Sequence, residues 1–168
     1  IDEGYIIRNP TNLVRIKGKN QRDIQYLNVE QIKTLLNYIF TSHIPRRSNS
    51  DKPIGSAWIV AAAILTGCRL NELAGLTWSH IDVKNGVIHI TRQLDRSGEF
   101  AELKTKSAKR DIPVPPSFIQ RLEQIKDDGD TFVFYAQTNK PITVTTASYE
   151  LKSLLKQCNI SARGFHFH

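Results

Sequence analysis

The sequence has few cysteines and no long hydrophobic run, and each absence excludes a class of protein. Its two cysteines, Cys68 and Cys158, form neither a CxxC pair nor the disulfide framework of a small secreted domain, which favours a reducing, cytoplasmic setting. No stretch reaches the roughly 18 consecutive apolar residues of a membrane-spanning helix. The first residues also lack the basic start and apolar centre of a signal peptide. We therefore expect neither a membrane span nor export.

Acidic residues are scarce relative to basic ones, which favours an anionic partner. The chain has 16 Asp and Glu against 23 Lys and Arg, a formal net charge of +7, and its pI is near 9.5. Nucleic acid is the commonest partner of such a basic domain, although a merely solvated basic surface would have the same composition. With 168 residues and 40% hydrophobic content, the chain can bury the core of one domain.

Local patterns predict a mainly helical chain with a small antiparallel β-sheet, an α+β fold. Asn28 and Gln31 form a capping-box pattern before the first helical periodicity, and Gly67 interrupts the next helical segment. Asn85-Gly86 marks a change to strand alternation. Helices are expected at residues 29–40, 54–65, 70–76 and 115–126, and from a cap at Thr145 or Thr146 to about 158. Strands are expected at residues 87–91, 99–105, 110–113 and 131–135.

The two ends of the chain differ from this regular part. Residues from about 9 to 22 contain Pro10, Gly18 and several cations with little periodicity, which predicts a basic linker. The chain begins without Met and ends in Gly-Phe-His-Phe-His, so we expect it to be a fragment of a longer protein.

Arg69 and Glu72 form the first candidate site. A separation of three residues on a helical turn brings the two side chains within reach of each other. An exposed ion pair of this kind contributes only about 0–1 kcal/mol and is often without function. Here, however, Arg69 follows the glycine break at the end of a buried helix, where a carboxylate would hold the guanidinium in a fixed position.

A second candidate is the basic segment Lys104-Thr105-Lys106-Ser107-Ala108-Lys109-Arg110, which we expect on or beside a hairpin turn. Four cations in seven residues are compatible with a solvated turn. A basic β-hairpin can also neutralise DNA phosphates, and one of its cations can deliver a proton to a leaving oxygen.

These segments together resemble the tyrosine recombinase family of the phage integrase type. Residues 66–82, TGCRLNELAGLTWSHID, are similar to the family's first arginine box, and residues 103–113, LKTKSAKRDIP, are similar to its lysine hairpin. Phe167-His168 resembles the start of its His-x-x-Arg box, and residues 4–10, GYIIRNP, look like the end of a preceding core-binding domain. The resemblance implies that residues 1–24 are the tail of that domain and a basic linker. Residues 25–168 would then be the amino-terminal part of a truncated catalytic domain.

The resemblance also implies a mechanism and roles for individual residues. Arg69, Lys104 and His168 would be catalytic, with Glu72 supporting Arg69 and with Lys106 as an alternative to Lys104. Strand exchange would proceed through a covalent tyrosine–DNA intermediate on double-stranded DNA, without a cofactor or metal, in a tetramer. Because the chain stops before the family's second arginine and its tyrosine nucleophile, we expect it to bind DNA without rejoining it. DNA contacts are expected from the basic residues of the hairpin and linker: Lys106, Lys109, Arg110, Arg15, Lys17 and Lys19.

Two other functions are compatible with parts of this pattern. A non-catalytic DNA-binding module would use the same basic segments without chemistry. A metal-dependent nuclease would use His166 and His168 with Asp111 or Glu102, but a metal site needs three or four ligands, and no HExxH or Cys/His set accompanies these histidines.

Overall fold

The structure is a computed structural model that describes residues 25–42, 55–95, 97–103, 105, 108–124, 126, 132–135 and 140–165. The helices, including a short 3₁₀ turn, are α1 (Val29–Ser42), α2 (Ser56–Thr66), α3 (Leu70–Ala74), η2 (Trp78–His80), α4 (Pro116–Glu123) and α5 (Val144–Gln157). The strands are β1 (Ile81–Asp82), β2 (Val87–Ile90), β3 (Arg92–Leu94), β4 (Phe100–Glu102) and β5 (Arg110–Pro113). The expected class, mainly helical with small antiparallel sheets, is confirmed.

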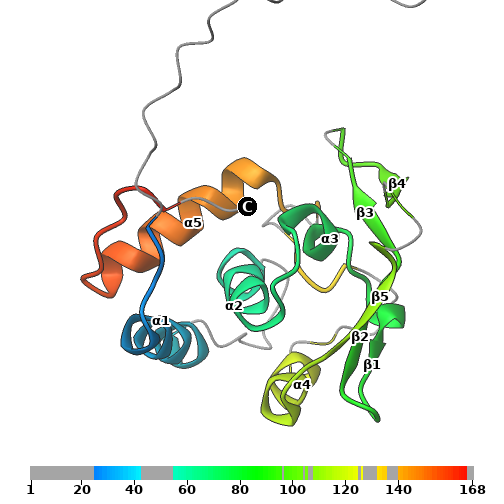
Figure 1. Cartoon of the computed structure of the whole chain (residues 1–168), viewed down its shortest axis with the longest axis horizontal. Helices are drawn as coiled ribbons and strands as arrows, with labels where there is room; N and C mark the ends of the chain where they lie inside the picture. The colour runs from blue at the N-terminus through cyan, green and yellow to red at the C-terminus, as the bar shows by residue number, and fades with distance from the viewer. Residues whose placement is uncertain are drawn as a thin grey trace, which may run out of the picture.

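Helix α2 lies at the centre of the molecule, with α1 and α5 on one side and the strands on the other (Figure 1). Six consecutive residues from Ala57 to Ala62 are buried, as expected for a helix that is apolar on most sides. One apolar cluster joins α2 to α1 and α5 through residues such as Leu35, Ile39 and Leu154. A second cluster joins α2 to α3, α4 and the strands.

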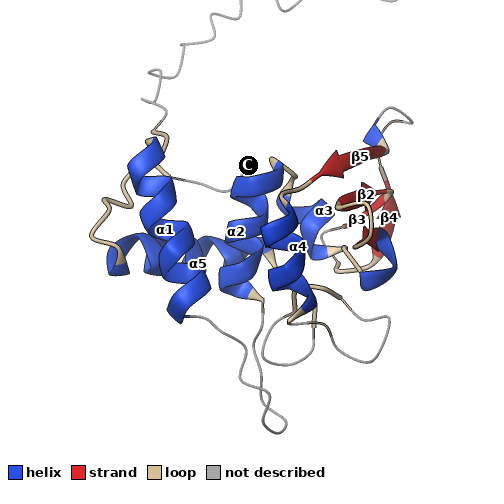
Figure 2. Ribbon diagram, turned by 90° about the horizontal axis from the view of Figure 1, so that it is seen from below, coloured by secondary structure: helices blue, strands red, loops and turns tan. Residues whose placement is uncertain are grey.

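Figure 2 shows the strands together at one end of the molecule. Within the described residues they form two antiparallel sheets, whereas the sequence predicted one. Strand β2 pairs with both β1 and β5, with Ile88 opposite Ile81 and Ile112. Strand β3 pairs only with β4 among the described strands. Strands β4 and β5 do not pair with each other, so the described strands do not form a hairpin around the basic segment, part of which lies outside the described residues.

Side-chain caps mark where helices α1 and α5 begin. At the start of α1, Asn28 Oδ1 accepts the N–H of Gln31 at 2.9 Å and the Asn28 N–H donates to Gln31 Oε1 at 3.0 Å, so the capping box is confirmed. Helix α5 begins earlier than expected, because Thr143 and not Thr145 or Thr146 is its cap. The Thr143 hydroxyl accepts the N–H of Thr146 at 3.1 Å.

Two further expectations are corrected. Helix α4 ends at Glu123, before the expected end at residue 126. No strand forms in residues 132–135: Phe132 bridges to Thr77 and Tyr135 bridges to Pro141, with a bend between them. Because the two residues pair with different segments, no continuous ladder develops. Among the described residues, no helix is both long enough and apolar enough to cross a membrane.

Candidate functional site

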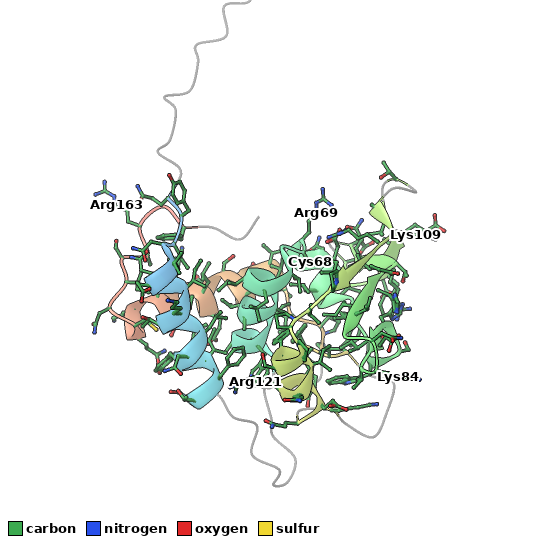
Figure 3. All side chains as sticks on the ribbon, turned by 60° about the horizontal axis from the view of Figure 1, so that its bottom comes forward. Cys68, Arg69, Lys84, Lys109, Arg121 and Arg163 are labelled. Atoms are coloured by element: carbon green, nitrogen blue, oxygen red, sulfur yellow. The ribbon has the colours of Figure 1, made fainter. Side chains whose placement is uncertain are left out.

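The site begins at the corner between α2 and α3, which places Arg69 at the surface. Gly67 ends α2 in the left-handed conformation, with φ of 65°, and its N–H donates to Ala63 O. Arg69 has extended backbone angles and occupies the N-cap position of α3. In Figure 3 its side chain projects from this corner on the same side of the view as Lys109, whereas Lys84 and Arg121 lie on the opposite side.

Glu72 lies beneath this corner and binds Arg69 at two points. Its Oε2 accepts the backbone N–H of Arg69 at 2.9 Å, and its Oε1 accepts Arg69 Nη1 at 3.2 Å. The first bond satisfies an amide that a helix leaves without a partner in its own backbone. The predicted proximity of Arg69 and Glu72 is therefore confirmed, and the carboxylate fixes both the backbone and the side chain of Arg69.

Strand β5 brings a second arginine to the same carboxylate. Arg110 Nη1 donates to Glu72 Oε1 at 3.0 Å and Arg110 Nη2 donates to Oε2 at 2.7 Å, a bidentate pair. Arg110 also donates to Ala108 O at 3.1 Å, and its Nη2 lies 3.7 Å from Cys68 Sγ. Arg110 was expected to contact DNA, and in the structure both terminal nitrogens of its side chain bind Glu72.

The three charged side chains differ sharply in exposure. Glu72 is 1% exposed, Arg110 is 33% exposed and Arg69 is 71% exposed. One buried carboxylate thus lies between two guanidinium groups, which leaves a net positive charge at the surface. Within the described part of the chain, the Arg69 side chain makes no other hydrogen bond, so most of its N–H groups remain available to an anion.

This arrangement fixes the protonation state of Glu72. Burial alone would raise the pKa of Glu72, but the hydrogen bonds from the Arg110 side chain and the Arg69 backbone outweigh that effect and hold the pKa below its ordinary value. Hydrogen bonding to Glu72 in turn raises the pKa of Arg110. Burial raises the pKa of the Cys68 thiol, which is therefore a poor nucleophile at neutral pH.

The structure describes only some of the residues that the sequence singled out. Lys109 is exposed and immediately precedes Arg110. The remaining candidates lie outside the described residues: Lys104, Lys106, His166, His168, Arg15, Lys17 and Lys19. Sequence reasoning missed the Glu72–Arg110 pair, which joins residues 38 positions apart. The available signal was a glutamate on the apolar side of a short helix, because a buried carboxylate requires strong donors.

Of the residues considered for metal binding, only Asp111 and Glu102 are described, and His166 and His168 lie outside the described residues. Asp111 Oδ1 lies 2.7 Å from Nδ1 of His89, its cross-strand neighbour, and Glu102 lies on the other sheet. The described residues contain no group of three His, Cys, Asp or Glu side chains that could hold a metal ion.

Comparison with known proteins gives the family. The phage integrase family matches residues 25–168, most of the chain. The chain belongs to this family of tyrosine recombinases. A tyrosine recombinase XerC-like protein of Caldanaerobacter subterraneus subsp. tengcongensis is 25% identical over 99% of this chain and 48% of its own length. An integrase of Streptomyces ambofaciens is 27% identical over 60% of this chain and 31% of its own length.

Solved structures have the same fold as this phage integrase family chain. The Tn1549 transposon integrase, in complex with transposon right end DNA, superposes with a TM-score of 0.70 and 23% identity over 94% of this chain and 53% of that chain. The XerA recombinase superposes with a TM-score of 0.59 and 17% identity over 95% of this chain and 49% of that chain. The chain thus spans about half the length of the XerC-like protein and of these two structures, and less of the Streptomyces ambofaciens integrase.

Proposed function

We propose that this chain forms the phosphate-binding part of a site-specific DNA recombinase that acts by metal-free phosphoryl transfer through a covalent tyrosine–DNA intermediate. One observation carries the proposal: Arg69 is exposed while a buried carboxylate holds it from behind. The Tn1549 integrase in complex with transposon DNA supports double-stranded DNA as the partner of this chain as well.

The chemistry of a phosphodiester explains why such an arginine is required. The negative oxygens of the phosphate repel a nucleophile and gather further charge in the transition state. Without a metal, fixed cations must compensate that charge, and a guanidinium can bind two oxygens at once while remaining protonated. Because Glu72 fixes Arg69 before DNA arrives, little reorganisation accompanies binding. Loss of Arg69 would raise the barrier by on the order of 3 kcal/mol.

The remaining steps use residues that the resemblance assigns. Lys104 would protonate the departing 5′ oxygen, with Lys106 as the alternative, and His168 would assist proton transfer. The tyrosine nucleophile would follow His168 in the longer protein, so the 168-residue chain should bind DNA without forming a covalent adduct. Lys109, Lys106 and the linker cations Arg15, Lys17 and Lys19 would neutralise phosphates. Exchange between two duplexes would require a tetramer on DNA.

The test is covalent trapping with the natural protein continued past His168. A nicked duplex is incubated with the protein in the presence and absence of EDTA, and a denaturing gel separates protein–DNA adducts. We expect an adduct that survives EDTA, with no adduct from Arg69→Ala despite nearly unchanged DNA affinity. A metal requirement would indicate a nuclease instead. DNA binding without an adduct on any substrate would indicate a non-catalytic binding module.

A further inference from the structure

Arg110 contacts the residues on both sides of Arg69. Its Nη2 lies near Cys68 Sγ, one residue before Arg69, and both of its terminal nitrogens bind Glu72, three residues after it. We propose that Arg110 is a positioning residue that holds Arg69 in its outward orientation by occupying Glu72. This inference rests on the proposed function, because it assigns a role in the same phosphate site.

The hydrogen bonds of Glu72 show how the two arginines divide the carboxylate. Two carboxylate oxygens offer about four acceptor positions, and Arg69 and Arg110 together donate four hydrogen bonds to Glu72. Arg110 donates two of them in bidentate geometry. The Arg69 side chain donates only one, at 3.2 Å, which is the longest of the four. Arg110 therefore supplies the bidentate side-chain contact to Glu72, and the Arg69 side chain adds one longer hydrogen bond that leaves most of its guanidinium exposed.

Arg110 is itself held on a paired strand. It lies opposite Ile90 in the β2–β5 pairing, and its Nη1 also donates to Ala108 O. A guanidinium on a strand that is anchored at both its backbone and its side chain loses little further freedom on binding Glu72. The bidentate contact thus connects the three-stranded sheet to the corner between α2 and α3.

Removal of Arg110 should redirect Arg69. A buried carboxylate without its bidentate partner has a high desolvation cost, and Arg69 is the other cation that contacts it in the described part of the chain. Its guanidinium would turn inward toward Glu72 and away from a phosphate. The expected result is a slower chemical step with little change in DNA affinity.

The experiment uses the natural protein continued past His168 and measures single-turnover cleavage of a nicked duplex at saturating DNA, together with the dissociation constant. For Arg110→Gln we expect a rate lower by on the order of 100-fold, with a dissociation constant changed by less than about threefold. The matched control is Lys84→Gln, which removes one positive charge from the exposed turn between β1 and β2 and should leave both quantities unchanged.

The pH dependence separates positioning from general structural damage. In Arg110→Gln the acidic limb of the rate profile should move to higher pH, because Glu72 loses the hydrogen bonds that favour its ionised form. Arg110→Lys keeps the charge but not the bidentate geometry, so it should move the limb in the same direction and recover only part of the rate. This second variant also serves if Arg110→Gln does not fold.

Each outcome bears on one of the two proposals. A wild-type rate for folded Arg110→Gln would overturn the positioning role. Weaker DNA binding with an unchanged rate at saturating DNA would also overturn it, and would indicate that Arg110 contacts DNA directly. If the wild-type protein forms no adduct, the proposed function fails. The positioning role is then judged by NMR titration of the Glu72 carboxyl, whose pKa must rise in Arg110→Gln for the role to stand.

Discussion

At the scale of single residues, the protonation of Glu72 affects both the folding stability of the chain and the ion pairs of the site. It is a buried carboxylate with charged donors on both oxygens. Loss of either partner would destabilise the folded chain, because a buried charge would then be less well compensated. Its pKa is lower in the folded chain than in the unfolded chain. Its contribution to stability is therefore complete above its ordinary pKa and is lost as the pH falls through the lower, folded value.

Glu72→Gln tests this linkage. At neutral pH the substitution should lower the free energy of unfolding by about 3 kcal/mol, because two guanidinium groups lose their anionic partner. The difference from wild type should shrink as the pH falls below the ordinary carboxyl pKa, which urea unfolding between neutral pH and acid would measure. Glu30→Gln is the control, since its pair with Lys33 is exposed, and it should change stability by less than about 1 kcal/mol. A difference that is constant with pH would contradict the assignment of the linkage to Glu72.

At the scale of elements, the corner between α2 and α3 depends on the conformation of Gly67. A left-handed backbone disfavours any residue with a Cβ, although a Cβ at this position would meet no atom within 4 Å. Gly67→Ala should therefore cost about 1 kcal/mol through backbone strain alone, and Gly67→Asn should cost less.

The measurement for Gly67 is the urea midpoint of the two variants. Gly55→Ala is the contrasting variant, because its Cβ would lie 2.1 Å from Tyr135 O and should cost much more through a steric clash. Equal costs for Gly67→Ala and Gly67→Asn would show that the left-handed conformation does not limit this corner.

Local signals account for what could be predicted at this scale. The Asn28–Gln31 capping box, the apolar run of α2 and the break at Gly67 involve neighbouring residues, and each is confirmed in the structure. The division of the strands into two sheets could not be predicted, because β2 pairs with β5 although β3 and β4 lie between them in the sequence. Arg69 and Glu72 were found together because they are one helical turn apart. Arg110 was not assigned to them because its position depends on that same sheet pairing.

At the scale of the whole molecule, the net charge is +7, but the basic residues that produce it are not equally placed to contact DNA near Arg69. Arg110 is committed to Glu72, and Lys84 and Arg121 lie away from Arg69 in Figure 3, whereas Lys109 lies on the same side as Arg69. If DNA occupies the surface around Arg69, Lys109 should neutralise a phosphate and Lys84 should not. Each phosphate contact releases condensed counterions, so the salt dependence of binding counts such contacts.

The last prediction concerns the number of phosphate contacts that the salt dependence reports. Fluorescence anisotropy of the 168-residue chain with a labelled duplex, between about 50 and 200 mM salt, should give an affinity that falls linearly on logarithmic axes. Lys109→Gln should reduce the magnitude of the slope by about 1, as expected for the loss of one phosphate contact, while Lys84→Gln should leave it unchanged. Equal effects of the two variants would mean that the chain attracts DNA through its overall charge, with no preference for the surface that carries Arg69.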